Sequence, residues 1–426
     1  MRPISRRAVL AASAGLLAAS RAAQAQAVKP RLTLITQWST GSDGAAITAL
    51  GKKFEEQGGI WQHSPVPGFT TDMMNKLRAQ IMAGDPPACS QLKGPDIAAW
   101  SKIAPTVNLD QIVAAAGYEK VVAPDLVKIH RPFGHWIAMP LQVYRTNTMY
   151  YSKRAMDRAK ATKIPTNWAE FNELAEKMVA AGVTHPFANG GLRFDDGMKF
   201  ETSLCGINPA TYRAAVMELD DKALKSKDVL DAFVQVRKLA NWQDPNVATQ
   251  HYSVFLPRFI SGDMGILLSG GWAQGVMLNA GYKLDDFILA PGPTNNGKPV
   301  FILNADAFIF WQRKEPDLQA GQKLMAELVM QPAIQTMYSH ITGSIPVRTD
   351  VDLSGPDFSD GQREAAKTLK EAVAVNQVVL SLGHNMAQPN DMTAAMLDAI
   401  GEYAHNRAMT PEQGQERLIA AIDSAR

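Results

Sequence analysis

Cysteines and metal-binding patterns are scarce in this sequence. The 426 residues include two cysteines, Cys89 and Cys205, which lie far apart in the chain. An oxidising compartment would permit a disulfide between them, but two isolated cysteines are more often separate buried thiols, and we expect that here. The eight histidines show no zinc-binding spacing. We therefore expect no bound metal and no cofactor.

Sequence signatures of common enzyme classes are also absent. The chain contains no His-Glu-x-x-His, no Walker loop, no Gly-x-Ser-x-Gly elbow and no dinucleotide-binding Gly-x-Gly-x-x-Gly. We therefore do not expect an enzyme. A secreted enzyme that acts on carbohydrate stays open as an alternative, because paired catalytic carboxylates leave no sequence motif.

The only signal for a membrane lies at the start of the chain. Arg6 and Arg7 belong to a basic beginning, residues 8–19 are apolar, and small-x-small patterns end at Ala25 and Ala27. This order is typical of a secretory signal peptide over the first 27 residues. The paired arginines indicate twin-arginine export, with ordinary secretory export as the alternative. We expect a periplasmic protein, cleaved near Ala25 or Ala27, and no later membrane span.

Neither sign of charge is in surplus. The chain has 43 Lys and Arg against 41 Asp and Glu, and four of the basic residues but none of the acidic ones lie in the predicted signal. The rest of the chain therefore has 39 basic residues against 41 acidic residues. Such a balance provides no basic surface that would follow a phosphate backbone, so we expect no nucleic-acid partner.

The chain does contain short apolar strands that alternate with amphipathic helices. Residues 32–36 are typical of a strand, and a polar loop is expected over residues 37–44. Ile47, Leu50 and Phe54 then recur at the spacing of one helix face.

Two further helices have clear boundary signals. One is expected from about residue 71 to Gly84, before two prolines, and another begins after Asn167, a good capping residue. The alternation of strands and helices predicts an α/β chain, and the length favours two domains.

Several segments, in a fixed order, carry a family resemblance. They are residues 32–40, 82–87, 139–141, 145–153, 165–171, 259–265, 271–273 and 343–348. Residues 165–171, for example, fit the pattern Pro-x-x-Trp-x-Glu-Phe. Together the segments resemble the family 1 extracellular solute-binding proteins of carbohydrate ABC transporters, and most closely their glucose/mannose-binding branch.

This resemblance implies a periplasmic-binding-protein-like fold, in which two α/β lobes are joined by crossing hinge strands and enclose a ligand cleft. The expected N-terminal lobe holds residues 28–138 and 304–343, and the expected C-terminal lobe holds residues 143–300 and 348–426. The hinge crossings are expected near residues 138–143, 300–304 and 343–348. The resemblance further implies a monomeric carrier whose lobes close on a sugar and which delivers it to permease subunits in the membrane.

The resemblance also implies ligand-binding residues. Trp38 and Trp272 match aromatic positions of the family, Asp306 matches an acidic ligand residue, and His384 matches a ligand histidine of the glucose branch. Asp43 falls near an acidic position in the first loop, where it is also a plausible helix cap. Aromatic faces and charged hydrogen-bonding groups suit the C–H faces and hydroxyls of a sugar.

Departures from the family pattern bear on the substrate. Lys93 stands where the glucose branch has a histidine, and Arg193 and Phe194 stand in a segment that ends in tryptophan in the branch. Gly271 replaces an acid beside Trp272. A neutral mono- or oligosaccharide is the leading expectation, and an acidic or phosphorylated sugar paired with Lys93 or Arg193 is the alternative. Both cations are also plausible as rim residues that face water.

Overall fold

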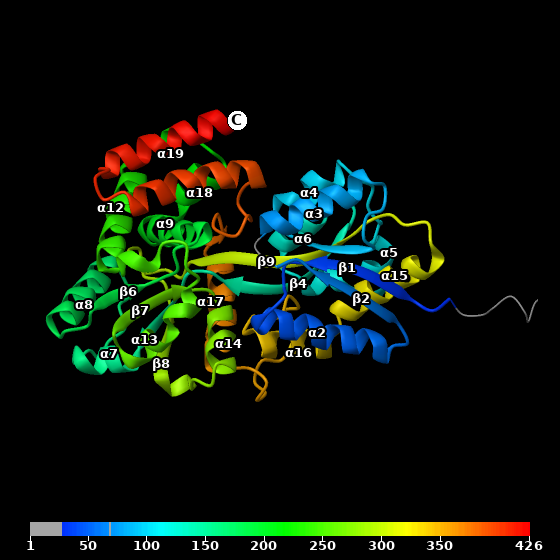
Figure 1. The fold of residues 1–426 in the computed structure, drawn as a ribbon, viewed down its shortest axis with the longest axis horizontal. Helices are drawn as coiled ribbons and strands as arrows, with labels where there is room; N and C mark the ends of the chain where they lie inside the picture. Colours follow the sequence, from blue (N-terminus) through cyan, green and yellow to red (C-terminus); the bar gives the residue numbers. More distant parts are fainter. Residues whose placement is uncertain (1–27, 68–69) are drawn as a thin grey trace, which may run out of the picture.

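The computed structural model describes residues 28–67 and 70–426 of the chain. The predicted signal peptide, with its paired arginines and its cleavage sites at Ala25 and Ala27, lies outside the described residues. Within them the chain forms two bodies side by side, and strands β4 (Ala138–Arg145) and β9 (Phe301–Phe310) run between the two (Figure 1). No helix in this part of the chain is long and apolar enough to cross a membrane.

The first body is built on a six-stranded sheet. Its strands follow the order β10-β9-β3-β1-β2, and β4 pairs with β9 outside that path. The remaining strands of this sheet are β1 (Arg31–Thr36), β2 (Ile60–Pro65), β3 (Cys89–Leu92) and β10 (Val378–Leu380). Strand β1 is parallel to β2 and β3, whereas β9 is antiparallel to β3 and β4.

Strand β9 pairs with three strands of this sheet. Residues 307–310 pair with β3, and residues 301–303 pair with β10 in parallel. Strand β4 pairs with β9 over most of this length, so it occupies the opposite edge of β9. Together, β4 and β9 form an antiparallel ribbon. Ile302 of β9 packs in the same apolar cluster as Phe200 and Tyr403, whereas Phe308 belongs to a different cluster, with Leu34 and Phe54.

Helices cover both faces of the six-stranded sheet. In Figure 1, α2 and α16 lie below the sheet, and α3, α4 and α6 lie above it. The helices of this body are α2 (Gly41–Glu56), α3 (Thr70–Met82), α4 (Pro95–Ser101), α5 (Asp110–Ala116), α6 (Pro124–His130), α15 (Pro316–Val329) and α16 (Pro332–Thr342), with a 3₁₀ turn at Tyr118–Val121. Leu34, Phe54 and Phe308 belong to the apolar core of this body.

The second body is built on a four-stranded sheet of order β6-β7-β5-β8. Its strands are β5 (Thr148–Ser152), β6 (His185–Ala188), β7 (Met264–Ser269) and β8 (Phe287–Pro291). Its longer helices are α8 (Trp168–Ala180), α9 (Arg193–Ile207), α12 (Lys227–Trp242), α14 (Trp272–Asn279), α17 (Asp360–Ala374), α18 (Asn390–His405) and α19 (Pro411–Ala425). Helices α9, α12, α18 and α19 stack above the sheet in Figure 1.

Short helices complete the second body. They are α7 (Lys153–Arg158), α10 (Pro209–Tyr212), α11 (Asp221–Leu224) and α13 (Leu256–Ser261), a π turn at Arg213–Met217, and 3₁₀ turns at Pro245–Val247, Tyr252–Phe255 and Leu284–Asp286. Phe171 and Met178 of α8 pack with Phe187 and Ile266 in one of its apolar clusters. This packing explains why the buried residues of α8 recur at helical spacing.

Several local predictions are confirmed. Strand β1 and helix α3 lie where they were expected. The side-chain oxygen of Asn167 accepts a 2.9 Å hydrogen bond from the backbone N–H of Glu170 and so caps α8. Cys89 and Cys205 are separate buried thiols, as expected.

The start of α2 differs from the prediction. The helix begins at Gly41, inside the expected polar loop, and Thr40 occupies its capping position. Asp43 is therefore not the cap but belongs to the first turn of the helix. The difference has a tertiary cause, because the Asp43 carboxylate is engaged by side chains of β4 rather than by its own helix.

Candidate ligand-binding site

The centre of the candidate site is a pair of carboxylates bridged by one amide. Antiparallel pairing places Gln142 of β4 directly opposite Asp306 of β9. The Gln142 Nε2 atom lies 3.2 Å from Asp306 Oδ2 and 3.3 Å from Asp43 Oδ1. A strand ladder thus holds Asp306, and helix α2 brings Asp43 to the same amide.

Two donors from the end of β3 complete the surroundings of Asp306. Gln91 donates from Nε2 to Asp306 Oδ1 over 3.0 Å, and the Lys93 ammonium lies 3.7 Å from the same oxygen. The side chains of Lys93 and Asp306 are 10 % and 5 % exposed, so this ion pair is largely shielded from water. Such shielding makes the pairing of the two charges matter more than it would at the surface.

Asp43 is the electrostatically costly member of the cluster. Burial raises the pKa of Asp43 to about 6, and the neighbouring Asp306 carboxylate adds to the rise. Hydrogen bonds from Gln142 and from the Tyr144 hydroxyl, 3.2 Å away, act in the opposite direction. The pKa of Tyr144 lies well above its usual value, chiefly because of burial, so this phenol stays a neutral donor.

An aromatic group adjoins these polar residues through the Tyr144 side chain. Trp272 begins helix α14 and meets the Tyr144 ring edge-on, with 5.2 Å between ring centroids. The His384 ring lies 4.9 Å from Trp272 and 5.5 Å from Phe194. A Cβ atom at Gly270 would lie 2.1 Å from the Trp272 ring, so the turn before α14 depends on that glycine.

His384 is an uncharged member of the aromatic group. Burial and the nearby Lys93 charge hold the pKa of His384 well below its usual value. A neutral imidazole has one donor and one acceptor nitrogen. The aromatic group therefore offers two apolar faces and one polar edge without adding a charge.

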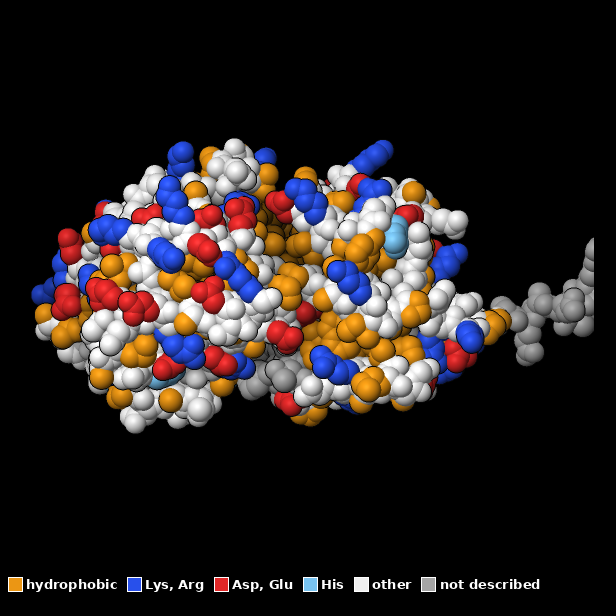
Figure 2. All heavy atoms as spheres, turned by 90° about the horizontal axis from the view of Figure 1, so that it is seen from above, with side chains coloured by type: hydrophobic (Ala, Val, Ile, Leu, Met, Phe, Trp, Pro, Cys, Tyr) orange, Lys and Arg blue, Asp and Glu red, His pale blue; other side chains and the backbone are white. Residues whose placement is uncertain are grey.

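The two bodies also meet directly beside the site. Asp96 of α4 accepts a hydrogen bond from the backbone N–H of Asn390, the first residue of α18. A Cβ atom at Gly94 would lie 2.5 Å from the backbone oxygen of Asn385, so these two segments of the backbone approach closely. In the view from above, the surface is hollowed between the two bodies, and hydrophobic side chains are visible in the hollow (Figure 2).

A family model described as bacterial extracellular solute-binding protein matches residues 49–368. This chain belongs to that family. The prediction of an extracellular solute-binding protein is thereby confirmed, whereas membership of the glucose/mannose branch stays a prediction.

Curated relatives agree with the family. The chain is 32% identical to a "Probable sugar-binding periplasmic protein" of Brucella suis biovar 1 over 93% of both chains. It is also 32% identical to a protein of the same name from Rhizobium meliloti, over 98% of both chains.

Solved structures share the fold. A "Chitin oligosaccharide binding protein" aligns with a TM-score of 0.77 and 20% identity, covering 93% of this chain and 98% of its own. The structure named "Maltose bound T. maritima MalE3" aligns with a TM-score of 0.76 and 15% identity, covering 93% of this chain and all of its own. The predicted periplasmic-binding-protein-like α/β fold is confirmed by these alignments.

Not all of the predicted site residues of this solute-binding protein come together. Of the predicted residues, Asp43, Lys93 and Asp306 belong to the polar cluster, and Phe194, Trp272 and His384 form the aromatic group. Trp38 is 6 % exposed and lies in the apolar core, where its ring packs against Phe308 and Tyr338.

Arg193 is directed away from the polar cluster. Its guanidinium pairs with Asp398 of α18 and donates to the backbone oxygen of Ala394. The side chains of Arg193 and Asp398 are 54% and 59% exposed. This environment favours the interpretation of Arg193 as a rim residue that faces water.

Three members of the polar cluster were missed as site residues by sequence reasoning. They are Gln91, Gln142 and Tyr144. A signal for the last two was present, since polar groups two positions apart in an apolar strand share one face of it. Their importance depends on the pairing of β4 with β9, which no local pattern reveals.

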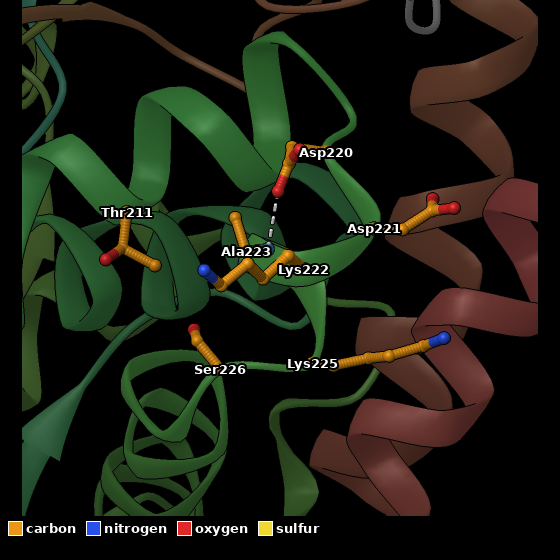
Figure 3. A pocket seen from close by; sticks show the side chains of 7 residues that line it. All are labelled: Thr211, Asp220, Asp221, Lys222, Ala223, Lys225 and Ser226. Atoms are coloured by element: carbon orange, nitrogen blue, oxygen red, sulfur yellow. Dashed lines mark hydrogen bonds between the residues drawn. The ribbon is translucent and has the colours of Figure 1, made fainter.

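A second hollow lies on the outer surface, in the region of α10 and α11 (Figure 3). Asp220 there accepts a 2.7 Å hydrogen bond from the backbone of Ala223, and so serves α11 as a cap. The side chains of Asp221 and Lys225 extend away from Thr211 in the close view. Unlike the cluster around Asp306, this hollow presents no shielded pair of charges to a ligand. In residues 28–67 and 70–426, no group of three His, Cys, Asp or Glu side chains is arranged to hold a metal ion.

Proposed function

We propose that this solute-binding protein is the periplasmic substrate-binding component of an ABC importer and that it binds a sugar between its two lobes. The observation that carries the proposal is the polar cluster of Asp43, Gln142, Asp306 and Lys93, which the Tyr144 side chain connects to the aromatic group of Phe194, Trp272 and His384. Carboxylates and amides can form several hydrogen bonds to adjacent hydroxyls, and an indole can cover the C–H face of a sugar ring. The names of the curated relatives support the same ligand class.

We propose a neutral mono- or oligosaccharide rather than an acidic or phosphorylated one. Lys93 is already paired with Asp306, and Asp43 contributes a second acid next to that pair. An anionic ligand would therefore meet more negative than positive charge. Arg193, the other candidate partner for an anion, is paired with Asp398 instead.

We further propose the lobe boundaries expected from the resemblance, namely residues 28–138 with 304–343 and residues 143–300 with 348–426. The β4–β9 ribbon and the segment around Ile345, which bridges to Val143, support crossings in these regions. Closure of the lobes on the sugar would then present one shape to membrane permease subunits. The protein would act as a monomeric carrier without enzymatic activity, after export by the twin-arginine route.

A thermal-shift screen of the purified protein tests the ligand class. A ligand that binds only the folded state at one hundred times its dissociation constant adds about 2.7 kcal/mol to stability. We expect neutral sugars to raise the melting temperature and sugar acids, sugar phosphates and polyols to have little effect. A shift confined to sugar acids or phosphates would favour the alternative ligand class, and hydrolysis of a glycoside panel would indicate an enzyme.

A matched pair of variants locates the binding. Asp306→Asn should remove the shift produced by the best sugar, because it alters the centre of the polar cluster. Asp317→Asn alters an acid of the same body that pairs with Arg31 over 2.7 Å, and it should keep the shift. An equal shift in both variants would place the sugar elsewhere.

A further inference from the structure

The loop that carries His384 is wrapped around a buried carboxylate. Glu201 of α9 is 0 % exposed. Its carboxylate accepts hydrogen bonds from the backbone N–H groups of Leu382 and Gly383, at 2.7 and 3.1 Å. It also accepts from the hydroxyls of Ser381, at 2.9 Å, and Thr146, at 2.9 Å. Four donors thus converge on two oxygens that belong to a neighbouring helix.

The donors around Glu201 decide where the Ser381 proton lies. A carboxylate only accepts, and the backbone N–H groups only donate. The single hydroxyl proton of Ser381 is therefore directed at Glu201, which leaves the Ser381 oxygen as an acceptor. That oxygen lies 3.2 Å from the backbone nitrogen of His384 and 3.1 Å from its ring atom Nδ1.

This arrangement selects one form of the His384 ring. Because the Ser381 hydroxyl already donates its proton to the hydrogen bond with Glu201, its oxygen can only accept from His384. Nδ1 of His384 must therefore carry the proton in the bond between the two side chains. In a neutral imidazole, Nε2 is then the bare acceptor. Nε2 has no hydrogen-bond partner within the described part of the chain, and the ring stands beside Trp272 and Phe194.

We propose that Glu201 is a positioning residue for sugar binding, which acts through Ser381 to hold His384 in the Nδ1–H form so that Nε2 faces the ligand as an acceptor. This inference rests on the proposed function, since it takes His384 as a ligand contact. Its consequence is a rule for the ligand: the group opposite Nε2 must have a hydrogen to donate. A hydroxyl or an amide satisfies that rule, whereas an ionised carboxylate or phosphate does not.

Nitrogen NMR of the histidine rings tests the relay in the ligand-free protein. Burial raises the pKa of Glu201 to about 7, so the spectra are recorded well above pH 7, where this carboxyl is ionised. His130 provides an internal reference, because its Nδ1 lies 2.6 Å from the backbone oxygen of Leu126, which can only accept. The His384 signals are assigned by their loss in His384→Asn. We expect His384 to show a protonated Nδ1 and a bare Nε2, as His130 does. A protonated Nε2 in the wild-type protein would overturn the inference.

Variants separate positioning from general support of the fold. Ser381→Ala removes the acceptor for Nδ1, so we expect mixed ring forms and an affinity for the best neutral sugar lower by about tenfold. Ser381→Thr keeps the hydroxyl and should preserve both the ring form of His384 and the affinity for the sugar. Thr146→Val removes another donor to Glu201 without touching the ring, and it should leave the ring form unchanged. Since Glu201→Gln risks misfolding, Ser381 carries the test.

The outcomes distinguish this inference from the proposed function. If Ser381→Ala changes the ring form but not the affinity for the sugar, Glu201 does not position a ligand contact, although sugar binding stands. If the wild-type protein binds no sugar at all, the proposed function fails and the role of His384 fails with it, whatever the NMR spectra show.

Discussion

Two buried carboxylates of this protein, Glu201 and Asp306, differ in the origin of their partners. Backbone N–H groups supply two of the donors to Glu201, and these cannot rotate away. Side chains supply the donors to Asp306, namely Gln91, Gln142 and Lys93. Donors on side chains can be exchanged for ligand hydroxyls, whereas donors on the backbone fix a loop. The same chemical group therefore serves as scaffold in one place and as a binding surface in the other.

The largest expected effect on stability comes from the substitution of Glu201. In Glu201→Gln, the amide oxygen can keep both backbone N–H groups, which share Oε2. The amide NH2 then replaces Oε1, so the buried hydroxyls of Ser381 and Thr146 lose that acceptor. We expect a loss of about 2–4 kcal/mol in the free energy of unfolding, measured by urea denaturation. Asp306→Asn, the matched variant, should cost only about 1 kcal/mol because its side-chain donors can rearrange. Equal losses would erase the proposed distinction between the two acids.

Lys93 and Arg193 extend the comparison to cations. Lys93→Ala should weaken binding of a neutral sugar by roughly 1.5–3 kcal/mol, because a charged donor is lost from a shielded cluster. An anionic ligand would lose roughly 2–5 kcal/mol instead. Arg193→Ala removes an exposed ion pair and should change the free energy of sugar binding by no more than about 0.5 kcal/mol. Calorimetric titration at low and high salt checks these values, and a larger effect at Arg193 than at Lys93 would contradict the placement of the site.

Trp272 and Trp311 allow a comparison of an aromatic residue expected to bind the ligand with one expected to stabilise the fold. Trp272→Ala should weaken sugar binding by roughly 1–3 kcal/mol and leave the melting temperature nearly unchanged, because this ring lies at a partly exposed site. Trp311 is fully buried, and its indole N–H donates to the Ser90 hydroxyl over 2.9 Å. Trp311→Ala should instead destabilise the fold. Titration calorimetry combined with thermal unfolding separates the two effects, and unchanged affinity in Trp272→Ala would show that the ring faces elsewhere.

A pH dependence of stability is expected from Asp43. Its pKa is about 6 in the folded protein, against an ordinary value of 3.8, because of burial and the nearby Asp306 charge. Between these values the folded state binds more protons than the unfolded state, so raising the pH lowers stability. One proton changes the free energy of unfolding by at most about 1.4 kcal/mol per pH unit.

Urea midpoints between about pH 4 and pH 6.5 measure that dependence. Asp43→Asn should reduce this slope without removing it, because burial also raises the pKa values of Asp96, Asp195 and Glu201. Asp125→Asn changes an exposed acid and should leave the slope as it is in the wild-type protein. A steeper fall in Asp43→Asn would mean that other groups control the titration.

The sequence predicted the parts of the molecule that depend on local patterns or on ordered motifs. The cap at Asn167 and the helix from Thr70 follow from residues close in the chain, and the fold followed from the order of the family segments. The bridging role of Gln142 depends on its pairing with Asp306, more than one hundred and sixty positions away. The start of α2 was misplaced for the same reason, because distant side chains engage Asp43.

The contact between Asp96 and the first N–H of α18 has a consequence for amide hydrogen exchange. A helix begins with N–H groups that lack partners in the helix itself, and for Asn390 the partner comes from the other body of the molecule. Any separation of α4 from α18 exposes this N–H to solvent while the rest of the helix stays bonded. The exchange rate at Asn390 should therefore report how often the bodies separate, with and without a bound sugar.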